Sequence, residues 1–250
     1  MFILLPPSEG KAAAGSGAPV DHDSLFLPQL RRSRERVLKA LVKLCSAKSK
    51  AGQAKALATL GLSEGQRDEL ARNADLPAAS TLPARHVYTG VLYDNLDLAS
   101  LSPEIDTGKI LVSSGLWGVV RLDDEIPPYR CSIGVNLPPV GGLTAYWKKA
   151  LSPALDREVR DELVLDLRSG AYAATWTPRE HLAVRVLQER DGKRMVVSHF
   201  NKATKGRVVR DLLLSGARPQ TTEELLGTLR DLKYLVEPTP KGFDIVVQEL

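Results

Sequence analysis

The stretch KILVSSGLWGVV, residues 109–120, contains the clearest buried strand of the sequence. Its apolar run at residues 109–113 is short and ends in a turn punctuated by glycine, which is the pattern of a buried strand. A similar run opens the chain at residues 1–5 and stops at Pro6 and Pro7, because neither proline can donate to a ladder. A third begins LVLDLRSGAYAATW, residues 163–176. These runs predict a sheet at the centre of the fold.

Helical patterns surround these strands. Residues 28–45 fit an amphipathic helix with its basic side chains outside. ALATLGLSEGQRDELARN, residues 56–73, predicts two helices joined by a tight turn, because Ser63 and Gln66 form a capping box and Gly61 suits a C-cap. Residues 143–163 predict a helix with a break at Pro153, whereas residues 86–96 fit either a strand or a small helical turn.

The C-terminal part predicts further strands. Residues 182–189 and 193–200 form a hairpin pattern around Asp191 and Gly192, a type I′ turn signal, and residues 242–250 read as a closing strand. Repeats and long linkers are absent from the sequence. We therefore predict a single α+β domain over residues 1–250, with a mixed sheet flanked by helices and a helical hairpin in its N-terminal third.

Composition sets the broad class. A net charge of +4 and a pI near 9 permit an anionic partner without demanding one, since only clustered charge creates a useful field. Such clusters occur at residues 31–43, 48–55 and 201–210. The first five residues are too short for a signal peptide, and the two distant cysteines predict neither a disulfide framework nor a zinc site. We expect a cytoplasmic protein that neither spans nor binds a membrane.

Polar residues follow each of the three buried strands. The first leads to Ser8–Lys11, the second to Ser114 and Arg121, and the third to residues 168–172. Because ligands in α/β sheets bind beyond the carboxyl ends of strands, the three turns together predict a pocket, although each alone could be a plain turn. Nucleotide-binding and metal-ligand motifs are absent, so we expect no cofactor and no metal.

Lys205 interrupts an apolar stripe. In a helix from Asn201 onward, the residues around it on one face are Val208, Val209, Leu212 and Leu213. If residues 202–206 stand at the helix start, free N–H groups and the helix dipole would join Lys202 and Lys205 in binding an anion. The alternative is a lysine whose stem packs while its ammonium reaches water.

Several segments together resemble the YaaA family of peroxide-stress proteins. They are VYTG (87–90), SGLWGVVRLDDEIPPYR (114–130), AYWK (145–148), LVLDLRSGAY (163–172) and SHFNKATKGRVVR (198–210). The resemblance implies an unusual α+β fold with a basic cleft, a helix-hairpin-helix-like element at about residues 50–75, and a cytoplasmic role in limiting damage linked to peroxide and free iron. It also implies DNA, duplex or distorted, as the partner. The chain departs from the family pattern near its N-terminus. Glu9 stands where the family has a lysine, and Lys11 could take over the role of that lysine.

The expected DNA or phosphate contacts follow from this resemblance and from the basic clusters. They are Lys11, Arg121, Arg130, Lys202, Lys205, Gly206, Arg207 and Arg210. The aromatic residues Tyr88, Trp117, Tyr129, Trp147 and Tyr172 are candidates for stacking on unpaired bases. Arg130 could make the neighbouring Cys131 reactive toward peroxide, although a small buried residue is the simpler interpretation.

Two other classes of function stay open. An enzyme acting on a small anionic or nucleobase-like substrate would use the same basic pocket, with Ser114, Tyr129, Tyr172 and Lys205 as catalytic candidates. No nucleophile–base set can be recognised, so the sequence names no reaction. The third class is a protein-interaction module without chemistry. A small deep pocket favours the enzyme, an open basic groove the DNA-binding protein, and a flat apolar patch the interaction module.

Overall fold

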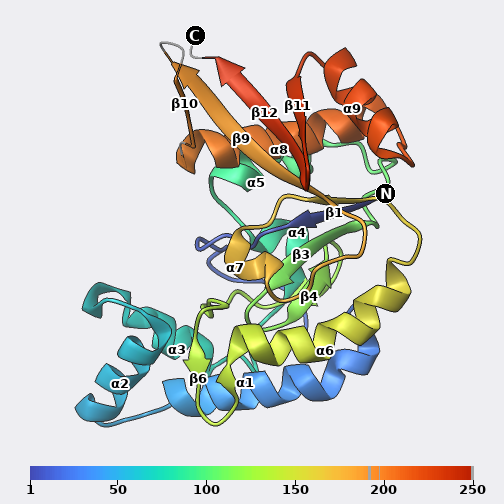
Figure 1. Ribbon diagram of the computed structural model, residues 1–250. Coiled ribbons are helices and arrows are strands. Elements are labelled where there is room, and N and C mark those ends of the chain that lie inside the picture. Colours follow the sequence, from blue (N-terminus) through green and yellow to red (C-terminus); the bar gives the residue numbers. More distant parts are fainter. Residues whose placement is uncertain (191–192, 197, 249–250) are drawn as a thin grey trace.

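A mixed sheet of eight strands forms the centre of the computed structural model, which describes residues 1–190, 193–196 and 198–248 (Figure 1). The strand order is β11-β12-β9-β8-β1-β3-β4, and β10 pairs with β9. The bounds are β1 Phe2–Leu5, β3 Ile110–Ser114, β4 Gly118–Arg121, β8 Val164–Asp166, β9 Leu182–Arg190, β10 Lys193–Met195, β11 Leu235–Thr239 and β12 Gly242–Gln248. Short pairs form between β2 (Leu82–Pro83) and β5 (Glu125–Ile126), and between β6 (Asn136–Leu137) and β7 (Gly141–Gly142).

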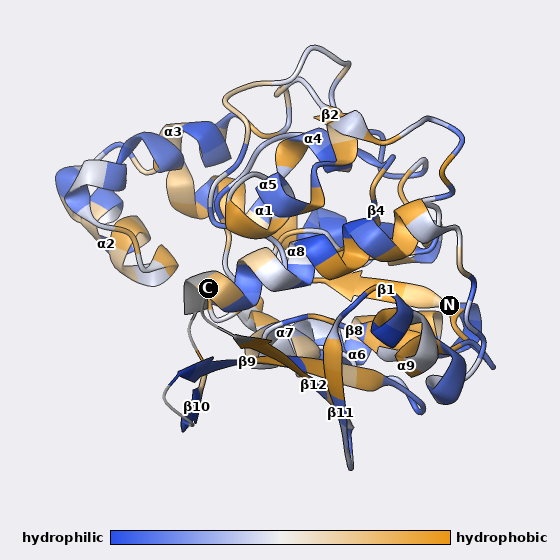
Figure 2. Ribbon diagram, turned by 90° about the horizontal axis from the view of Figure 1, so that it is seen from above, coloured by the Kyte–Doolittle hydropathy of each residue, from blue (hydrophilic) through white to orange (hydrophobic). Residues whose placement is uncertain are grey.

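The five central strands run parallel, with antiparallel edges at β4 and β11. Every residue of β1, β3 and β8 is buried, as the apolar runs predicted. Parallel strands covered on both faces require such continuous apolar sequences. Figure 2 shows the difference in composition: the central strand β1 is hydrophobic in colour, whereas the edge strand β10 is hydrophilic. The predicted α+β class with a mixed sheet is confirmed.

Helices cover both faces of the sheet. Their bounds are α1 Arg31–Cys45, α2 Lys50–Leu60, α3 Asp68–Ala74, α4 Ala84–Val87, α5 Val91–Leu96, α6 Leu143–Glu158, α7 Gly170–Ala173, α8 Ser198–Ser215 and α9 Thr222–Asp231. Single 3₁₀ turns lie at Pro28–Leu30, Glu64–Gln66 and Leu98–Ser100. In Figure 1, α5 and α8 lie between β9–β12 at the top and β1, β3 and β4 in the middle, whereas α1 and α6 lie below the sheet. A hydrogen bond of 3.1 Å from the Tyr146 hydroxyl to the Ser33 carbonyl joins α6 to α1. None of the helices in the described part of the chain is long and apolar enough to cross a membrane.

The predicted helical hairpin is present in α2 and α3. Ser49 caps α2 by accepting a hydrogen bond from the Gly52 N–H at 3.1 Å. Gly61 ends α2 in the left-handed region, with φ of 65°, and the Ser63 N–H donates to Gln66 Oε1 at 3.1 Å. Gly61, Ser63 and Gln66 are the cap residues that the sequence predicted, and they fix the turn.

A buried arginine ties α1 to the sheet edge. Arg34 has no exposed surface, and its guanidinium donates to the carbonyls of Trp117 at 3.1 Å, Val119 at 3.0 Å, Leu27 at 3.3 Å and Phe26 at 2.5 Å. Burial lowers the pKa of Arg34 to about 10. The side chain therefore stays charged near neutral pH and joins three segments through backbone oxygens.

Several element predictions need correction. The helix α6 runs unbroken through Pro153. Of the two alternatives for residues 86–96, the helical one holds, because α4 ends at Val87 and α5 covers Val91–Leu96. The helix α8 begins at Ser198, so Lys202 and Lys205 lie beyond its first turn, whose free N–H groups are not beside them. The strands β9 and β10 pair antiparallel as predicted, but β10 ends at Met195 and residues 198–200, predicted as strand, belong to α8. The predicted turn at residues 191–192 lies outside the described residues.

Candidate functional site: a cationic cavity at the carboxyl ends of the central strands

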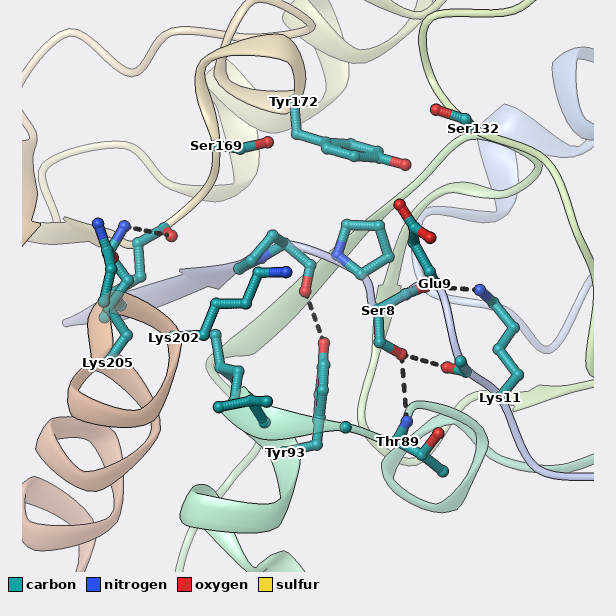
Figure 3. A pocket seen from close by; sticks show the side chains of 18 of the residues that line it. Ser8, Glu9, Lys11, Thr89, Tyr93, Ser132, Ser169, Tyr172, Lys202 and Lys205 are labelled. Atoms are coloured by element: carbon teal, nitrogen blue, oxygen red, sulfur yellow. Dashed lines mark hydrogen bonds between the residues drawn. The ribbon is translucent and has the colours of Figure 1, made fainter. Parts of the chain in front are cut away.

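A cavity of about 790 Å³ opens where the parallel strands β1 and β8 end (Figure 3). The segment after β1 forms one wall, the segment after β8 a second, and α5 and α8 the others. The lining residues that the following paragraphs use are Pro6, Ser8, Glu9, Lys11, Thr89, Leu92, Tyr93, Tyr129, Arg130, Cys131, Leu167, Ser169, Tyr172, Asn201, Lys202 and Lys205. The predicted pocket beyond the strand ends is thus present for two of the three strands.

The charge of the lining is predominantly positive. Lys11, Arg130, Lys202 and Lys205 line the cavity, and Glu9 carries the opposite charge. These four cations come from three distant segments of the sequence. Hydrogen bonds of Arg130 to Glu9 hold it beside the segment of Lys11, and the packing of α8 on α5 and β9 brings Lys202 and Lys205 to the same cavity. Lys202 is exposed, whereas Lys11 and Arg130 are half-buried.

Lys205 is the most buried of the four cations, with 9% of its surface exposed. Its Nζ donates to the Leu167 carbonyl at 3.0 Å (Figure 3). The neighbouring Asp166 does not pair with it, because Arg168 Nε and Nη2 hold both oxygens of that carboxylate at 2.9 and 2.7 Å. Burial lowers the pKa of Lys205 to about 8, although the charge of Asp166 acts in the opposite direction. A lysine inside an apolar stripe is thereby explained: its amine faces a cavity instead of core atoms.

Lys11 lies on the other side of the cavity. Its Nζ donates to the Ser8 carbonyl at 2.7 Å and lies 4.7 Å from the centre of the Tyr129 ring. Burial, followed by the positive charge of Arg130, lowers the pKa of Lys11 to about 8. A second cavity amine is therefore partly neutral near physiological pH.

Arg130 is held in place from two directions. Its N–H donates to Asn73 Oδ1 at 2.9 Å, and its carbonyl accepts from Asn73 Nδ2 at 2.7 Å. Its guanidinium contacts the Glu9 carbonyl at 3.0 Å and Glu9 Oε2 at 3.3 Å. Because 89% of the Glu9 side chain is exposed, an incoming anion can displace this carboxylate from Arg130.

Hydrogen bonds order the segment between Pro6 and Lys11. The Tyr93 hydroxyl donates to the Pro6 carbonyl at 2.7 Å. The Ser8 hydroxyl donates to the Gly10 carbonyl and accepts from the Thr89 N–H, the latter at 3.1 Å (Figure 3). This wall is therefore built before any ligand arrives.

Tyr172 provides an aromatic surface on the opposite wall. Figure 3 shows its ring crossing the cavity above Ser8 and Tyr93. Burial raises the pKa of Tyr172 to about 12, so its hydroxyl is protonated at neutral pH. It can donate a hydrogen bond, but it is a poor general base there.

Among the described residues, no group of three or more His, Cys, Asp and Glu side chains is arranged to hold a metal ion. What the cavity offers chemically is cationic nitrogen, hydroxyl groups and an aromatic face.

The family model described as "Peroxide stress protein YaaA" matches residues 1–239. The chain belongs to the YaaA family. Its relatives include the UPF0246 protein SCO2297 of Streptomyces coelicolor, 50% identical over 263 residues that cover 100% of both chains. A UPF0246 protein of Corynebacterium glutamicum is 39% identical over 96% of both chains, and the protein Cj0984 of Campylobacter jejuni is 30% identical over 100% of both.

Membership of the YaaA family confirms the predicted resemblance and its link to oxidative stress. The remaining expectations concern residues, and the structure separates them into two groups. Lys11, Arg130, Lys202, Lys205, Tyr129 and Tyr172 line one cavity in this YaaA-family chain. Arg121, Gly206, Arg207, Arg210 and Ser114 lie elsewhere.

Arg121 is at the wrong end of the sheet for the cavity. It pairs with Leu111 near the amino end of β3, where its guanidinium contacts Glu158 Oε1 at 3.2 Å and lies 4.2 Å from the Phe26 ring centre. Arg210 binds the carbonyls of Leu96 and Asp97 at 3.1 and 2.9 Å. Both arginines thus brace loops.

Gly206 faces a neighbouring helix. A Cβ built on it would lie 2.2 Å from the Leu92 carbonyl oxygen of α5. A glycine permits the close approach of a phosphate or of a facing backbone, and here the structure shows a facing backbone. Arg207 is exposed on the same helix, with Nη2 3.4 Å from Thr204 Oγ1.

Ser114 and Tyr129 form a buried hydroxyl chain with Tyr88. Ser114 Oγ is 2.6 Å from the Tyr129 hydroxyl, which is 3.2 Å from the Tyr88 hydroxyl. Ser114 Oγ also accepts from the Trp117 N–H at 2.8 Å, and only 1% of Ser114 is exposed. Burial raises the pKa of Tyr129 well above its ordinary value. Ser114 therefore caps the turn after β3 and does not line the cavity, which places it apart from the other catalytic candidates Tyr129, Tyr172 and Lys205.

Most of the predicted base-stacking residues are core residues. Tyr88, Trp117, Tyr129 and Trp147 are each at most 3% exposed. Of that set, Tyr129 and Tyr172 line the cavity, and Tyr172 is the more exposed of the two. Cys131 is buried too, and burial raises the pKa of its thiol to about 12, which opposes reaction with peroxide at neutral pH.

Two functional features escaped the sequence. The first is Tyr93, whose hydroxyl donates to the Pro6 carbonyl. In the sequence it is simply a tyrosine after VYTG, and nothing there indicates this contact. The bidentate pair of Asp166 and Arg168 is the second, although their i, i+2 spacing at a strand end could have suggested it.

Proposed function

We propose that this protein is a cytoplasmic peroxide-stress protein that binds DNA at the cationic cavity and its rim. The observation that carries the proposal is the convergence of Lys11, Arg130, Lys202 and Lys205 on one cavity. Phosphate contacts dominate the affinity of proteins for DNA, and Lys and Arg side chains supply them.

The placement of the helical hairpin supports an extended partner. The arrowheads of β1 and β3 point to the side of the molecule from which α2 and α3 project (Figure 1). Lys50 and Lys55 are exposed on α2. A strand lying across this side could therefore meet the cavity rim and the hairpin together.

The size of the cavity limits how DNA enters it. A volume of about 790 Å³ lies within the range of small-ligand pockets and cannot hold a duplex. Backbone phosphates would contact Lys202 and Arg130 at the rim, while a nucleotide turned out of a distorted duplex would enter and meet Tyr172.

This activity gives a physical route to limiting iron-linked damage. Hydroxyl radicals made from peroxide and ferrous iron react within a few ångströms of where they form. A protein that covers weakened DNA would shield the sites that such radicals reach. We include this route in the proposal.

The salt dependence of binding tests the proposal. Affinity would be measured for a fluorescent duplex and a bubble duplex at several salt concentrations, for wild type, Lys202→Ala/Lys205→Ala and Lys148→Ala/Lys149→Ala. The control lysines are exposed on α6, which lies below the sheet in Figure 1. Each lost phosphate contact should flatten the log–log slope by about 0.9.

We expect a slope flattened by about 1.8 in the cavity variant and an unchanged slope in the control. Equal slopes in the two double variants, or absence of binding at about 150 mM salt, would contradict DNA binding at this cavity. In the second case a small anionic or nucleobase-like substrate becomes the better candidate, because the cavity volume suits one. A thermal shift with nucleoside monophosphates would then test it.

A further inference from the structure

We propose that Lys205 is a nucleophile that forms an imine with an aldehyde on damaged deoxyribose in DNA. The inference rests on the proposed DNA binding and adds a covalent chemistry to the same cavity. Its substrate class is the ring-opened abasic site, a C1′ aldehyde.

The first argument is the pairing of Lys205. Among the described residues, its hydrogen-bond partner is the Leu167 carbonyl, and the carboxylate closest in sequence to that partner, Asp166, is held by Arg168. A carbonyl accepts one of the N–H bonds, so the lone pair of a neutral amine stays free. An ion pair would instead have fixed the amine in its charged form.

The second argument is comparison with the other cations of the cavity. Lys11 lies 4.7 Å from the Tyr129 ring centre, and a ring face attracts the charged ammonium. Lys202 is exposed at the rim, where water surrounds it. Arg130 carries no nucleophilic nitrogen at neutral pH. Lys205 therefore combines burial, access to the cavity and freedom from a charged or aromatic partner better than any of these three.

The third argument is the protonation of the amine. The pKa of Lys205 is about 8, so roughly a fifth of the molecules carry a neutral amine at pH 7.4. Lysines that act through Schiff bases are activated by such desolvation.

The surroundings suit a sugar phosphate. Lys202 stands one helical turn before Lys205 on α8 and can contact a flanking phosphate, and Ser169 and Asn201 offer hydrogen bonds to sugar hydroxyls. Tyr172 can stack on a neighbouring base. An abasic nucleotide is also the easiest one to turn out of a duplex, because it has no base pair to break.

The step balances without a redox partner. The neutral Lys205 amine adds to the C1′ aldehyde carbon while the aldehyde oxygen takes up a proton, giving a carbinolamine. Loss of water then leaves a protonated imine. The net change converts one ammonium group and one aldehyde to one iminium ion and one water.

Borohydride trapping tests the inference. The probe is a duplex with a single abasic site, produced from deoxyuridine, incubated with the whole protein and sodium borohydride. Hydride reduces the iminium carbon and leaves a stable secondary amine, seen as a shifted band on a denaturing gel. We expect an adduct with wild type and with Lys148→Arg, an exposed lysine of α6 outside the cavity lining, but none with Lys205→Arg, which keeps the positive charge. The trapping rate of wild type should rise about tenfold per pH unit up to about pH 8.

Two further readouts keep the outcome decisive. Mass spectrometry of the wild-type adduct must place the modification on Lys205, which needs no variant to fold. Pyridoxal 5′-phosphate with borohydride tests the nucleophile without DNA, and its adduct must map to the same residue. DNA binding without an adduct, or an adduct on another lysine, overturns the inference and leaves DNA binding intact. Absence of DNA binding contradicts the proposed function, and labelling by pyridoxal phosphate then decides separately whether Lys205 is nucleophilic.

Discussion

Arg34 is a charged side chain that the fold buries completely and surrounds with carbonyl oxygens. Four backbone carbonyls from the segments before α1 and around β4 receive its donors. A guanidinium offers five N–H donors in a planar fork, so one side chain can satisfy acceptors that lie in several directions. The charge is retained because these carbonyls replace the hydration that burial removes.

We predict that Arg34→Lys destabilises the protein by about 3 kcal/mol or more, because an ammonium cannot reach all four carbonyls and leaves buried acceptors unpaired. Urea unfolding followed by circular dichroism measures the change. Arg32→Lys is the matched control, since Arg32 is exposed on the same helix and its replacement should leave the unfolding midpoint unchanged. Equal midpoints for the two variants would show that the fork geometry of Arg34 is dispensable.

At the scale of single residues, the sequence predicted best where a residue contradicted its own pattern. Lys205 stood out because an ammonium in an apolar stripe needs a reason, and the cavity supplies one. Tyr88 and Trp117 fit the hydrophobic pattern around them, so nothing in the sequence separated a core role from a binding role. Aromatic residues with a polar tip occur both in cores and at binding sites, and only tertiary packing decides between the two.

The helices α5 and α8 pack closely against each other beside the cavity. Both helices contribute lining residues, Leu92 and Tyr93 from α5 and Lys202 and Lys205 from α8. Gly206 permits this approach, because any side chain there would collide with the backbone of α5.

We predict that Gly206→Ala destabilises the protein by about 1–3 kcal/mol, because the methyl group overpacks the contact and the gain in helix propensity, about 1 kcal/mol, is smaller than the cost of moving α5. The same change should weaken DNA binding by shifting two walls of the cavity. Thermal unfolding and the duplex titration measure the two effects.

Gly227→Ala provides the control for this substitution. Gly227 lies within α9, and a Cβ there meets nothing within 4 Å. It should stabilise the protein by about 0.5–1 kcal/mol through helix propensity alone. A stabilising Gly206→Ala would mean that the helices can separate at no cost.

Elements with strong local signals were predictable. The apolar runs predicted the buried strands, and the cap residues Gly61 and Ser63 predicted the α2–α3 hairpin. Elsewhere local rules were overridden. Proline disfavours a helix interior, yet α6 continues through Pro153, since Leu151, Ala154 and Leu155 pack into the core on both sides of it. The start of α8 was misplaced by three residues because Ser198 follows a strand without a turn signal.

At the scale of the whole molecule, the pairing order of the sheet assembles the site. β1 lies between β3 and β8, and their parallel direction places the segments after β1 and β8 side by side. The sequence predicted that such segments would carry a ligand but not which strands are neighbours. For that reason the sequence assigned Arg121, the last residue of the antiparallel edge strand β4, to a site at the opposite end of the sheet.

Two lysines from opposite walls make binding sensitive to pH. The pKa values of Lys11 and Lys205 are both about 8 in the free protein, whereas phosphate contacts require the charged forms. Affinity for the duplex should therefore be highest below about pH 7 and fall as the pH rises through 8, as the amines lose their protons.

We predict that Lys11→Arg/Lys205→Arg abolishes this decline between pH 7 and 9, since arginine stays charged throughout. Fluorescence anisotropy at constant ionic strength measures it. Lys202→Arg should keep the wild-type profile, because Lys202 is exposed and its replacement does not change the two buried amines. A wild-type profile flat across this interval would contradict the titration of these amines in the binding step.

The position of β1 in the middle of the sheet has a consequence for how the protein is made. Phe2 pairs with Val164, so β1 leaves the ribosome well before a neighbouring strand that is synthesised 162 positions later. At about 5–20 residues per second, that delay is roughly 10–30 s. During translation the apolar segment FILL can pair on one side at most, with β3, which makes the nascent chain a client for chaperones and a truncated chain prone to aggregate.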